Sequence, residues 1–205
     1  ARDEKARDIR ASFLLAGAML GRFGKAVMPM PGGCSIGLRP VDLHLKGFTS
    51  LGAECNIEQG MVNIEAKELK GNEVYLDFPS VGATENIMLA GVLAKGETTI
   101  SNCAIEPEIV DLAKFLNSIG AKISGAGTDT IVIKGVNELG GCCHRVIPDR
   151  IEAGTFMIAV AGAGGNVKIQ DVIPEQLRPV ISKLKEADVE VKEDENSVTV
   201  CSDGF

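Results

Sequence analysis

Aromatic residues are scarce in this sequence: it has no Trp and a single Tyr, and aromatics make up 4% of its 205 residues. Any hydrophobic core must therefore be built mainly from Ala, Val, Ile, Leu and Met, although 45% of the chain is hydrophobic. That content is sufficient for one substantial core or for two modest ones.

Positive charge is also in short supply. The chain has 21 Lys and Arg residues against 28 Asp and Glu residues, which gives a formal net charge of -7. A nucleic-acid partner would need a basic face for its phosphates, so we expect none. A small anionic ligand is still compatible with this charge, because a few focused Arg side chains are enough to bind it.

Metal ligands are few. The chain has two His residues, and its six Cys residues include no CxxC pair, so we expect no metal and no cofactor. The Cys residues are at positions 34, 55, 103, 142, 143 and 201. We expect all except Cys34 to be buried, reduced thiols of a cytoplasmic protein.

Long hydrophobic runs are missing too, since the apolar segment at residues 11–20 is too short to span a bilayer. No small-residue cleavage site follows it, so we predict neither a signal peptide nor membrane insertion. The sequence begins inside a charged helix start and stops at Phe205, just after an expected strand. We therefore expect a partial chain, and the oligomeric state stays open.

The sequence contains an internal repeat. Pro40, Pro107 and Pro174 are equally spaced, and each precedes an amphipathic helical pattern. Two short alternating strands follow each helix, and the first two copies continue with a third strand, a more apolar helix and a last strand. The amphipathic helices are expected at 41–53, 109–121 and 177–187. The strand pairs are expected at 53–57 with 61–65, 122–124 with 130–134, and 189–192 with 197–201. In the first two copies, we expect the third strands at 73–77 and 144–147, the apolar helices at 82–93 and 151–161, and the last strands at 98–101 and 166–169.

These units predict an α/β fold whose strand pairing is mixed, as in α+β proteins. The opening segment, residues 8–23, is an apolar helix like those at 82–93 and 151–161, and we expect all three to be buried at a domain centre. One copy alone could not bury its helix faces, so several copies must pack together.

A loop rich in Gly and Pro interrupts this pattern at residues 28–40. Gly32 and Gly33 allow the backbone to move or to approach a ligand, and Cys34 follows them, five positions before Arg39. A basic neighbour would lower the pKa of a loop thiol and make it reactive. The alternative is a loop Cys that packs as a small hydrophobic residue.

The run PGGCSIGLRPVDLH at residues 31–44 resembles the signature loop of the UDP-N-acetylglucosamine enolpyruvyl transferases, in the EPSP synthase superfamily. Further segments similar to this family follow the same order over essentially the whole chain. They are residues 10–12, 80–84, 106–111, 148–152 and 154–156. The resemblance implies an inside-out α/β barrel of repeated βαβαββ subdomains, incomplete here at both ends.

The resemblance also implies an activity: transfer of the enolpyruvyl group of phosphoenolpyruvate to the 3-hydroxyl of UDP-N-acetylglucosamine, the first committed step of peptidoglycan synthesis. Cys34 would protonate the methylene carbon of phosphoenolpyruvate, and it would be the residue that fosfomycin alkylates. Arg10 and Arg39 would clamp the phosphate and carboxylate. Arg150 would lie near the domain junction and the substrates.

The sugar nucleotide would be bound by two short segments. Arg39, Pro40, Val41, Asp42 and Leu43 would frame the uridine, with Asp42 accepting a hydrogen bond from the base. Ser80, Val81 and Gly82 would offer backbone donors to the diphosphate at a helix start.

Several of these residues also have structural interpretations. Arg10 is typical of a solvated helix arginine, and Ser80 of an ordinary N-cap. Asp42 and His44 could be capping or surface residues near a helix start. His144 lies beside two Cys residues, yet we expect a strand residue rather than a metal ligand.

Other elements of the family pattern have no counterpart in this sequence: an N-terminal Lys-Asn pair, an aspartate base and later arginines. The resemblance therefore implies most of the Cys-loop domain at residues 1–147 and the start of a second domain at 148–205, and we expect weak or no turnover from this chain alone. Two alternatives are kept: a 3-phosphoshikimate 1-carboxyvinyltransferase, which shares the fold but lacks the Cys loop, and a non-catalytic repeat scaffold.

Overall fold

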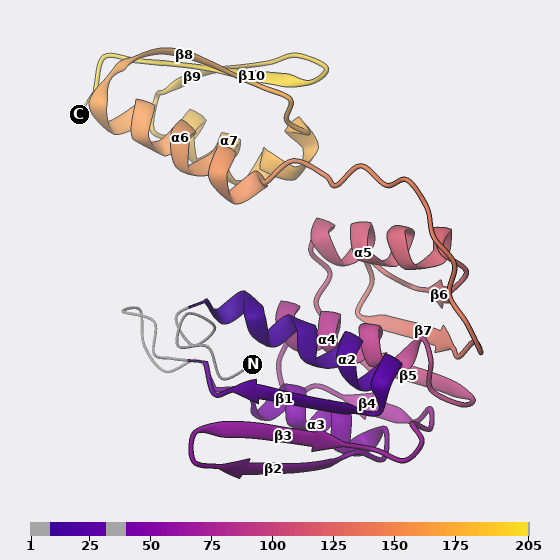
Figure 1. Cartoon of the computed structure of the whole chain (residues 1–205). Helices are drawn as coiled ribbons and strands as arrows, with labels where there is room; N and C mark the ends of the chain where they lie inside the picture. Colours follow the sequence, from indigo (N-terminus) through magenta and orange to yellow (C-terminus); the bar gives the residue numbers. More distant parts are fainter. Residues whose placement is uncertain (1–8, 32–39, 205) are drawn as a thin grey trace. The chain divides into compact units, whose positions relative to one another are not determined.

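The computed structural model describes residues 9–31 and 40–204 and divides the chain into two compact units (Figure 1). The first unit comprises Ala1–His144 and the second Arg145–Phe205. Each unit has its own cluster of buried hydrophobic side chains, so the chain has two cores. The sequence-based division into 1–147 and 148–205 remains a proposal about domains of a longer protein.

The first unit consists of two sheets and the helices packed on them. Its elements are η1 (Arg10–Leu14), α2 (Leu15–Phe23), β1 (Lys25–Pro29), α3 (Asp42–Ser50), β2 (Glu54–Glu58), β3 (Met61–Glu65), β4 (Glu73–Tyr75), α4 (Val81–Gly91), β5 (Glu97–Ser101), α5 (Pro107–Ser118), β6 (Lys122–Ser124) and β7 (Thr130–Lys134). One sheet has the order β1-β3-β2 and is antiparallel throughout. The other has the order β4-β5-β7-β6, in which β4 and β5 are parallel and the other pairs antiparallel.

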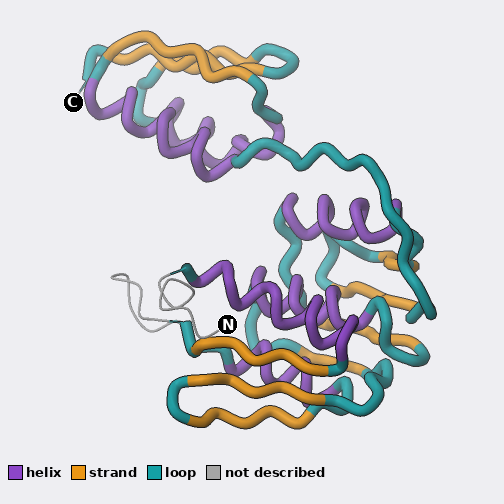
Figure 2. The backbone as a smooth tube through the Cα atoms, in the orientation of Figure 1, coloured by secondary structure: helices purple, strands orange, loops and turns teal. Residues whose placement is uncertain are grey.

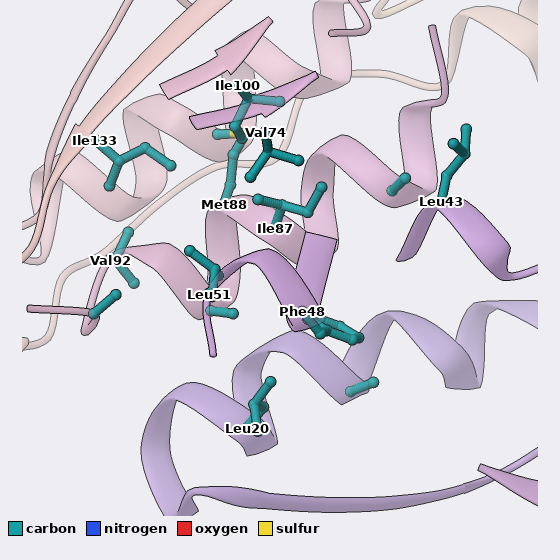
Figure 3. Packing of buried hydrophobic residues seen from close by; sticks show 14 of the residues in the cluster. Leu20, Leu43, Phe48, Leu51, Val74, Ile87, Met88, Val92, Ile100 and Ile133 are labelled. Atoms are coloured by element: carbon teal, nitrogen blue, oxygen red, sulfur yellow. The ribbon is translucent and has the colours of Figure 1, made fainter. Parts of the chain in front are cut away.

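Helix α4 lies at the centre of this unit, in contact with α2, α3 and α5. Its side chains Ile87 and Met88 are fully buried, and Figure 3 shows them among side chains from the neighbouring elements, including Phe48 of α3 and Leu20 of α2. The expected burial of the apolar helix at 82–93 is thus confirmed. Ala, Val, Ile, Leu and Met dominate this core, as the shortage of aromatics requires.

Glycine allows α2 and α3 to approach α4 closely. A Cβ atom at Gly17 would lie 2.2 Å from the backbone oxygen of Asn86, and one at Gly21 would lie 3.1 Å from that of Leu89. At Gly47 of α3, a Cβ atom would lie 2.3 Å from a side-chain carbon of Ile87. Non-bonded atoms essentially never approach as closely as 2.2 or 2.3 Å, and 3.1 Å is a tight contact, so the packing of these three helices depends on the absence of side chains at Gly17 and Gly47 in particular.

The second unit is a three-stranded antiparallel sheet covered by two helices. Its elements are α6 (Arg150–Ala163), β8 (Gly165–Gln170), α7 (Pro174–Glu186), β9 (Glu190–Glu193) and β10 (Ser197–Ser202), with the strand order β8-β10-β9. Within this unit α6 contacts α7 and the strands β8 and β10. Ile151, Phe156 and Ile158 of α6 are more than half exposed, so the expectation of a fully buried apolar helix is wrong here. The reason is that no further described helix of this unit covers that face of α6, unlike α4.

The repeat predicted from the sequence is visible in the order of elements. Helix α3 with its strands β2 and β3 corresponds to α5 with β6 and β7, and to α7 with β9 and β10. In the hairpin turn between β2 and β3, Gln59 and Gly60 both have positive φ, and Gly120 has positive φ just after the end of α5. The mixed helices and sheets confirm the α/β class.

One expected strand does not form. Residues 135–149 contain no helix and no strand, so the strand predicted at 144–147 is wrong (Figure 2). His144 Nε2 lies 3.2 Å from Asp111 Oδ1, and its ring packs edge-on against Phe115. The segment is therefore attached to α5 rather than to a sheet edge.

The exposure of the cysteines also differs from expectation. Cys142 and Cys143 are exposed, because they belong to this irregular segment. Cys103 is buried, whereas Cys55 and Cys201 are half-buried, and all five are free thiols. Among the described residues, no helix is long and apolar enough to cross a membrane.

The Gly17 contact predicts that Gly17→Ala destabilises the first unit by about 1–3 kcal/mol, because the added methyl group would overlap the backbone of α4. Helix propensity alone would predict the opposite sign, a gain of about 1 kcal/mol. Urea unfolding measures the difference. Ala18→Gly, at the exposed neighbouring position, is the matched control and should lose only the propensity contribution. A more stable Gly17→Ala variant would contradict the close contact.

Candidate functional site

A cavity of about 630 Å³ opens in the first unit where η1, α3 and α4 begin. Residues from the start of each of these helices line it. They are Arg10, Ala11, Phe13, Leu14, Pro40, Asp42, Leu43, His44, Phe78, Pro79, Ser80, Val81, Gly82 and Glu85. The volume is within the range of small-molecule sites in proteins.

The start of α4 presents backbone donors to this cavity. Ser80 is the N-cap, and its hydroxyl accepts from the Ala83 N–H at 3.4 Å. The first backbone bond of the helix runs from the Thr84 N–H to the Ser80 carbonyl at 2.9 Å. The N–H groups of Val81 and Gly82 have no acceptor among the residues that the structure describes, so they remain available to a ligand.

The start of α3 adds a second set of donors. Val41 is the N-cap, no side chain caps the helix, and the first backbone bond runs from the Leu45 N–H to the Val41 carbonyl at 3.0 Å. Because the partial positive charges at the N-termini of α3 and α4 meet at one cavity, the electrostatics favour an anion there.

The structure brings together most of the residues predicted to bind substrate. Arg10, Pro40, Asp42 and Leu43 line the cavity, as do Ser80, Val81 and Gly82 at the start of α4. The Arg10 Nη2 atom donates to the Pro40 carbonyl at 3.4 Å, which holds the η1 and α3 segments together. Val41 is buried and is not among the residues that line the cavity.

The remaining predicted residues are Cys34, Arg39 and Arg150. Cys34 and Arg39 lie outside the described residues. Arg150 is the first residue of α6 and belongs to the second unit, where the Asp149 side chain caps the helix by accepting from the Ile151 and Glu152 N–H groups.

Sequence reasoning missed that His44 belongs to the interior. The interpretation of His44 as a surface residue is wrong, because only 5% of it is exposed. Its Nδ1 atom lies 2.8 Å from Asn86 Nδ2, and its ring packs edge-on against Phe13 with a centroid distance of 5.2 Å. Burial lowers the pKa of His44 from 6.5 to about 4; the Arg10 guanidinium adds to this effect, and Asp42 opposes it.

Glu85 is a second residue that the sequence did not single out. It lies on α4 and lines the cavity. Burial raises the pKa of Glu85 from 4.5 to about 7, and the Glu108 carboxylate adds to the rise. Near neutral pH this carboxyl is therefore partly protonated, which reduces its repulsion of an anionic ligand.

Within the described part of the chain, no group of three or more His, Cys, Asp or Glu side chains could hold a metal ion. His144 does not join the two neighbouring Cys residues in such a group, because its ring is turned to Asp111. Cys142 lies instead beside the end of α5, where its Sγ atom accepts a hydrogen bond from the Ser118 hydroxyl at 3.0 Å.

Comparison with protein families matches residues 1–204 to the family described as EPSP synthase (3-phosphoshikimate 1-carboxyvinyltransferase). The chain therefore belongs to this family of enolpyruvyl transferases. Among solved structures, the enolpyruvyl transferase NikO from Streptomyces tendae superposes with a TM-score of 0.75 at 24% identity, over 95% of this chain and 47% of that one. An EPSP synthase from Acinetobacter baumannii superposes with a TM-score of 0.64 at 25% identity, over 95% of this chain and 46% of that one. The predicted fold class is thus confirmed.

Relatives with higher sequence identity than these solved structures are named for UDP-N-acetylglucosamine rather than for 3-phosphoshikimate. UDP-N-acetylglucosamine 1-carboxyvinyltransferase 1 of Caldanaerobacter subterraneus is 59% identical over 96% of this chain and 48% of its own length. The enzyme named UDP-N-acetylglucosamine 1-carboxyvinyltransferase 2 of Carboxydothermus hydrogenoformans is 58% identical over 98% of this chain and 48% of its own length. The predicted resemblance is confirmed, and the chain spans about half the length of the curated relatives it matches.

The two shifted pKa values predict opposite effects of pH on stability. Unfolded His44 gains a proton below pH 6.5, whereas folded His44 does so only near pH 4, so this residue lowers the free energy of unfolding as the pH falls through that window. Folded Glu85 holds a proton up to about pH 7 and the unfolded chain only up to about 4.5, so this residue raises stability as the pH falls from 7 to 4.5.

Urea unfolding at pH 7 and pH 5 separates the two effects. Relative to the unchanged chain, His44→Asn should gain about 2 kcal/mol between pH 7 and pH 5, because it removes the protonation of the unfolded imidazole. Glu85→Gln should instead lose stability relative to the unchanged chain over the same step. Equal pH dependence in all three proteins would contradict the assigned protonation states.

Proposed function

We propose that this chain forms part of an enzyme that transfers the enolpyruvyl group of phosphoenolpyruvate to the 3-hydroxyl of UDP-N-acetylglucosamine. The reaction would be the first committed step of peptidoglycan synthesis, in the cytoplasm. The observation that carries the proposal is the convergence of two helix N-termini and Arg10 on one cavity, at residues that the sequence resemblance assigns to substrate binding.

Each part of the cavity suits a part of the sugar nucleotide. The free N–H groups of Val81 and Gly82 can donate to the diphosphate, whose charge also benefits from the dipoles of α3 and α4. Asp42 is exposed at the start of α3 and can accept from the uracil N–H, while Pro40 and Leu43 offer apolar contacts. The names of relatives more than 50% identical favour this substrate over 3-phosphoshikimate.

The chemical step requires a proton at the methylene carbon of phosphoenolpyruvate while the sugar hydroxyl forms a bond to the adjacent carbon. Phosphate leaves when the proton is lost again and the carbon–carbon double bond is restored. We assign the proton donor to Cys34 and the clamping of phosphoenolpyruvate to Arg10 and Arg39, with Arg150 near the substrates. The base for the sugar hydroxyl has no counterpart in this chain.

Calorimetric titration of the 205-residue chain tests the substrate class. UDP-N-acetylglucosamine is expected to bind, and 3-phosphoshikimate is not, because only the sugar nucleotide offers both a diphosphate and a uracil. The variant Gly82→Ala should weaken binding, since its Cβ atom would fill space beside His44 at 3.1 Å from Cε1. Binding of 3-phosphoshikimate alone would sink the proposal and favour the alternative enzyme.

Fosfomycin labelling tests the role of Cys34. In the presence of UDP-N-acetylglucosamine, peptide mass spectrometry should find the adduct on Cys34 and not on the exposed Cys142 and Cys143, which serve as internal controls. Cys34→Ser should abolish labelling, and Cys142→Ser should leave it unchanged. Equal labelling of all exposed thiols would instead favour a non-catalytic scaffold.

Turnover should be weak or absent in this chain alone, because catalytic groups act together and several lie in segments without a counterpart here. Release of phosphate from phosphoenolpyruvate in the presence of UDP-N-acetylglucosamine measures it. Turnover at the rate of a complete enzyme would show that these 205 residues suffice.

A further inference from the structure

Cys142 and Cys143 are two exposed free thiols on consecutive residues. They belong to the segment at 135–149, which contains no helix and no strand (Figure 2). The function proposed above uses neither thiol, and neither lines the cavity at the starts of η1, α3 and α4. The sequence therefore places two soft sulfur donors side by side at the surface, outside that cavity.

Contacts with α5 hold this pair in place. The Gly140 N–H donates to the Ile119 carbonyl, just after the end of the helix, at 2.6 Å. Cys142 Sγ accepts from the Ser118 hydroxyl at 3.0 Å, and the ring of His144 lies within hydrogen-bonding distance of a carboxylate of α5. Since these contacts come before, at and after the two thiols, the pair occupies a defined place beside α5.

A direct disulfide between the two residues would be strained. Consecutive Cα atoms are about 3.8 Å apart across a trans peptide, whereas disulfides usually join Cα atoms about 4.4–6.8 Å apart. One bridging atom with bonds of about 2.3 Å to each sulfur, as in zinc thiolates, closes a larger ring and relieves this strain. Because the residues are adjacent, little chain entropy is lost when both sulfur atoms bind the same atom.

The number of donors limits the class of ion. Within residues 9–31 and 40–204, no third His, Cys, Asp or Glu side chain joins the pair in a group of three. His144, the next residue, is engaged with Asp111 and Phe115 of α5. Structural zinc needs four ligands, and Ca²⁺ and Mg²⁺ need oxygen ligands, so these ions do not fit. Two thiolates suit a soft ion of low coordination number, such as Cu⁺ or trivalent arsenic.

Other described thiols are poorer ligands. Cys103 is buried and Cys55 half-buried, and burial raises the pKa of both thiols. A thiol binds a soft ion as the thiolate, so a raised pKa opposes binding. Neither of them has a second Cys beside it in the sequence, and the same is true of the half-buried Cys201.

We propose that Cys142 and Cys143 form a surface site that chelates a thiophilic ion of low coordination number, of the class of Cu⁺ and trivalent arsenic. Binding is a ligand exchange without oxidation or reduction. Two S–H bonds break and two bonds from sulfur to the ion form, while the two protons pass to the solvent or to an oxygen that leaves the ion as water. The site is independent of the proposed enolpyruvyl transfer.

Phenylarsine oxide is the first probe, because its arsenic atom exchanges one oxygen for two sulfur atoms and releases one water. One equivalent is added to the reduced 205-residue chain, followed by an excess of the monothiol β-mercaptoethanol, and the intact mass is measured. An adduct held by two sulfur atoms should survive the monothiol, because the second bond forms within one molecule. Dithiothreitol, which is itself a chelating dithiol, should remove it.

We expect one retained adduct per chain, mapped by peptide mass spectrometry to residues 142–143. Cys142→Ser and Cys143→Ser should each lose the adduct to the monothiol, because each keeps a single sulfur atom. Cys55→Ser and Cys201→Ser are matched controls that should retain it. Both residues of the pair are exposed, so we expect their variants to fold, and urea unfolding checks this.

Competition for Cu⁺ with a colorimetric chelator is the second measurement. Each single variant of the pair should bind Cu⁺ roughly a hundredfold more weakly than the unchanged chain, as for the loss of a second point of attachment. Retention of one probe and not the other supports the site and identifies its ion. Retention of neither by the unchanged chain, or undiminished retention by either variant of the pair, would overturn the inference.

Discussion

The side-chain amide of Asn86 is the contact on which the rest of the first unit depends. From the centre of α4 it bonds to the backbone of Phe13 in η1, to the backbone of Gly17 in α2 and to His44 in α3. It thereby joins α4 to η1, α2 and α3, and the starts of η1, α3 and α4 line the cavity. The oxygen and the nitrogen of this amide therefore both have hydrogen-bonding partners inside the unit. A buried polar group that is fully hydrogen-bonded stabilises one particular arrangement, whereas an unsatisfied one weakens the core.

Glycine makes this amide contact possible. The Gly17 N–H can reach Asn86 only because no side chain separates α2 from α4, and Gly21 and Gly47 allow the same proximity elsewhere along α4. The close helix packing, the hydrogen bonds of Asn86 and the shape of the cavity therefore depend on one another. Among its described residues, the second unit has no buried amide that joins several helices in this way, and one face of α6 remains exposed.

Much of this architecture could be predicted from the sequence, because helices, hairpins and caps depend on local patterns. The equal spacing of Pro40, Pro107 and Pro174 predicted the repeat, and the family resemblance picked out the starts of α3 and α4. The interior role of His44 could not be predicted, since it depends on Asn86, which is 42 positions away. Nor could the irregular course of residues 135–149, where His144 contacts α5 rather than a neighbouring strand.

All residues that line the cavity belong to the first unit, and this has a consequence for the thermodynamics of the chain. A ligand that binds only the folded form shifts the folding equilibrium of the part that contacts it, by an amount set by its concentration relative to its dissociation constant. Occupancy of the cavity therefore couples to the melting of η1, α2, α3 and α4 as one cooperative block. The sheet and helices of the second unit have a hydrophobic core of their own.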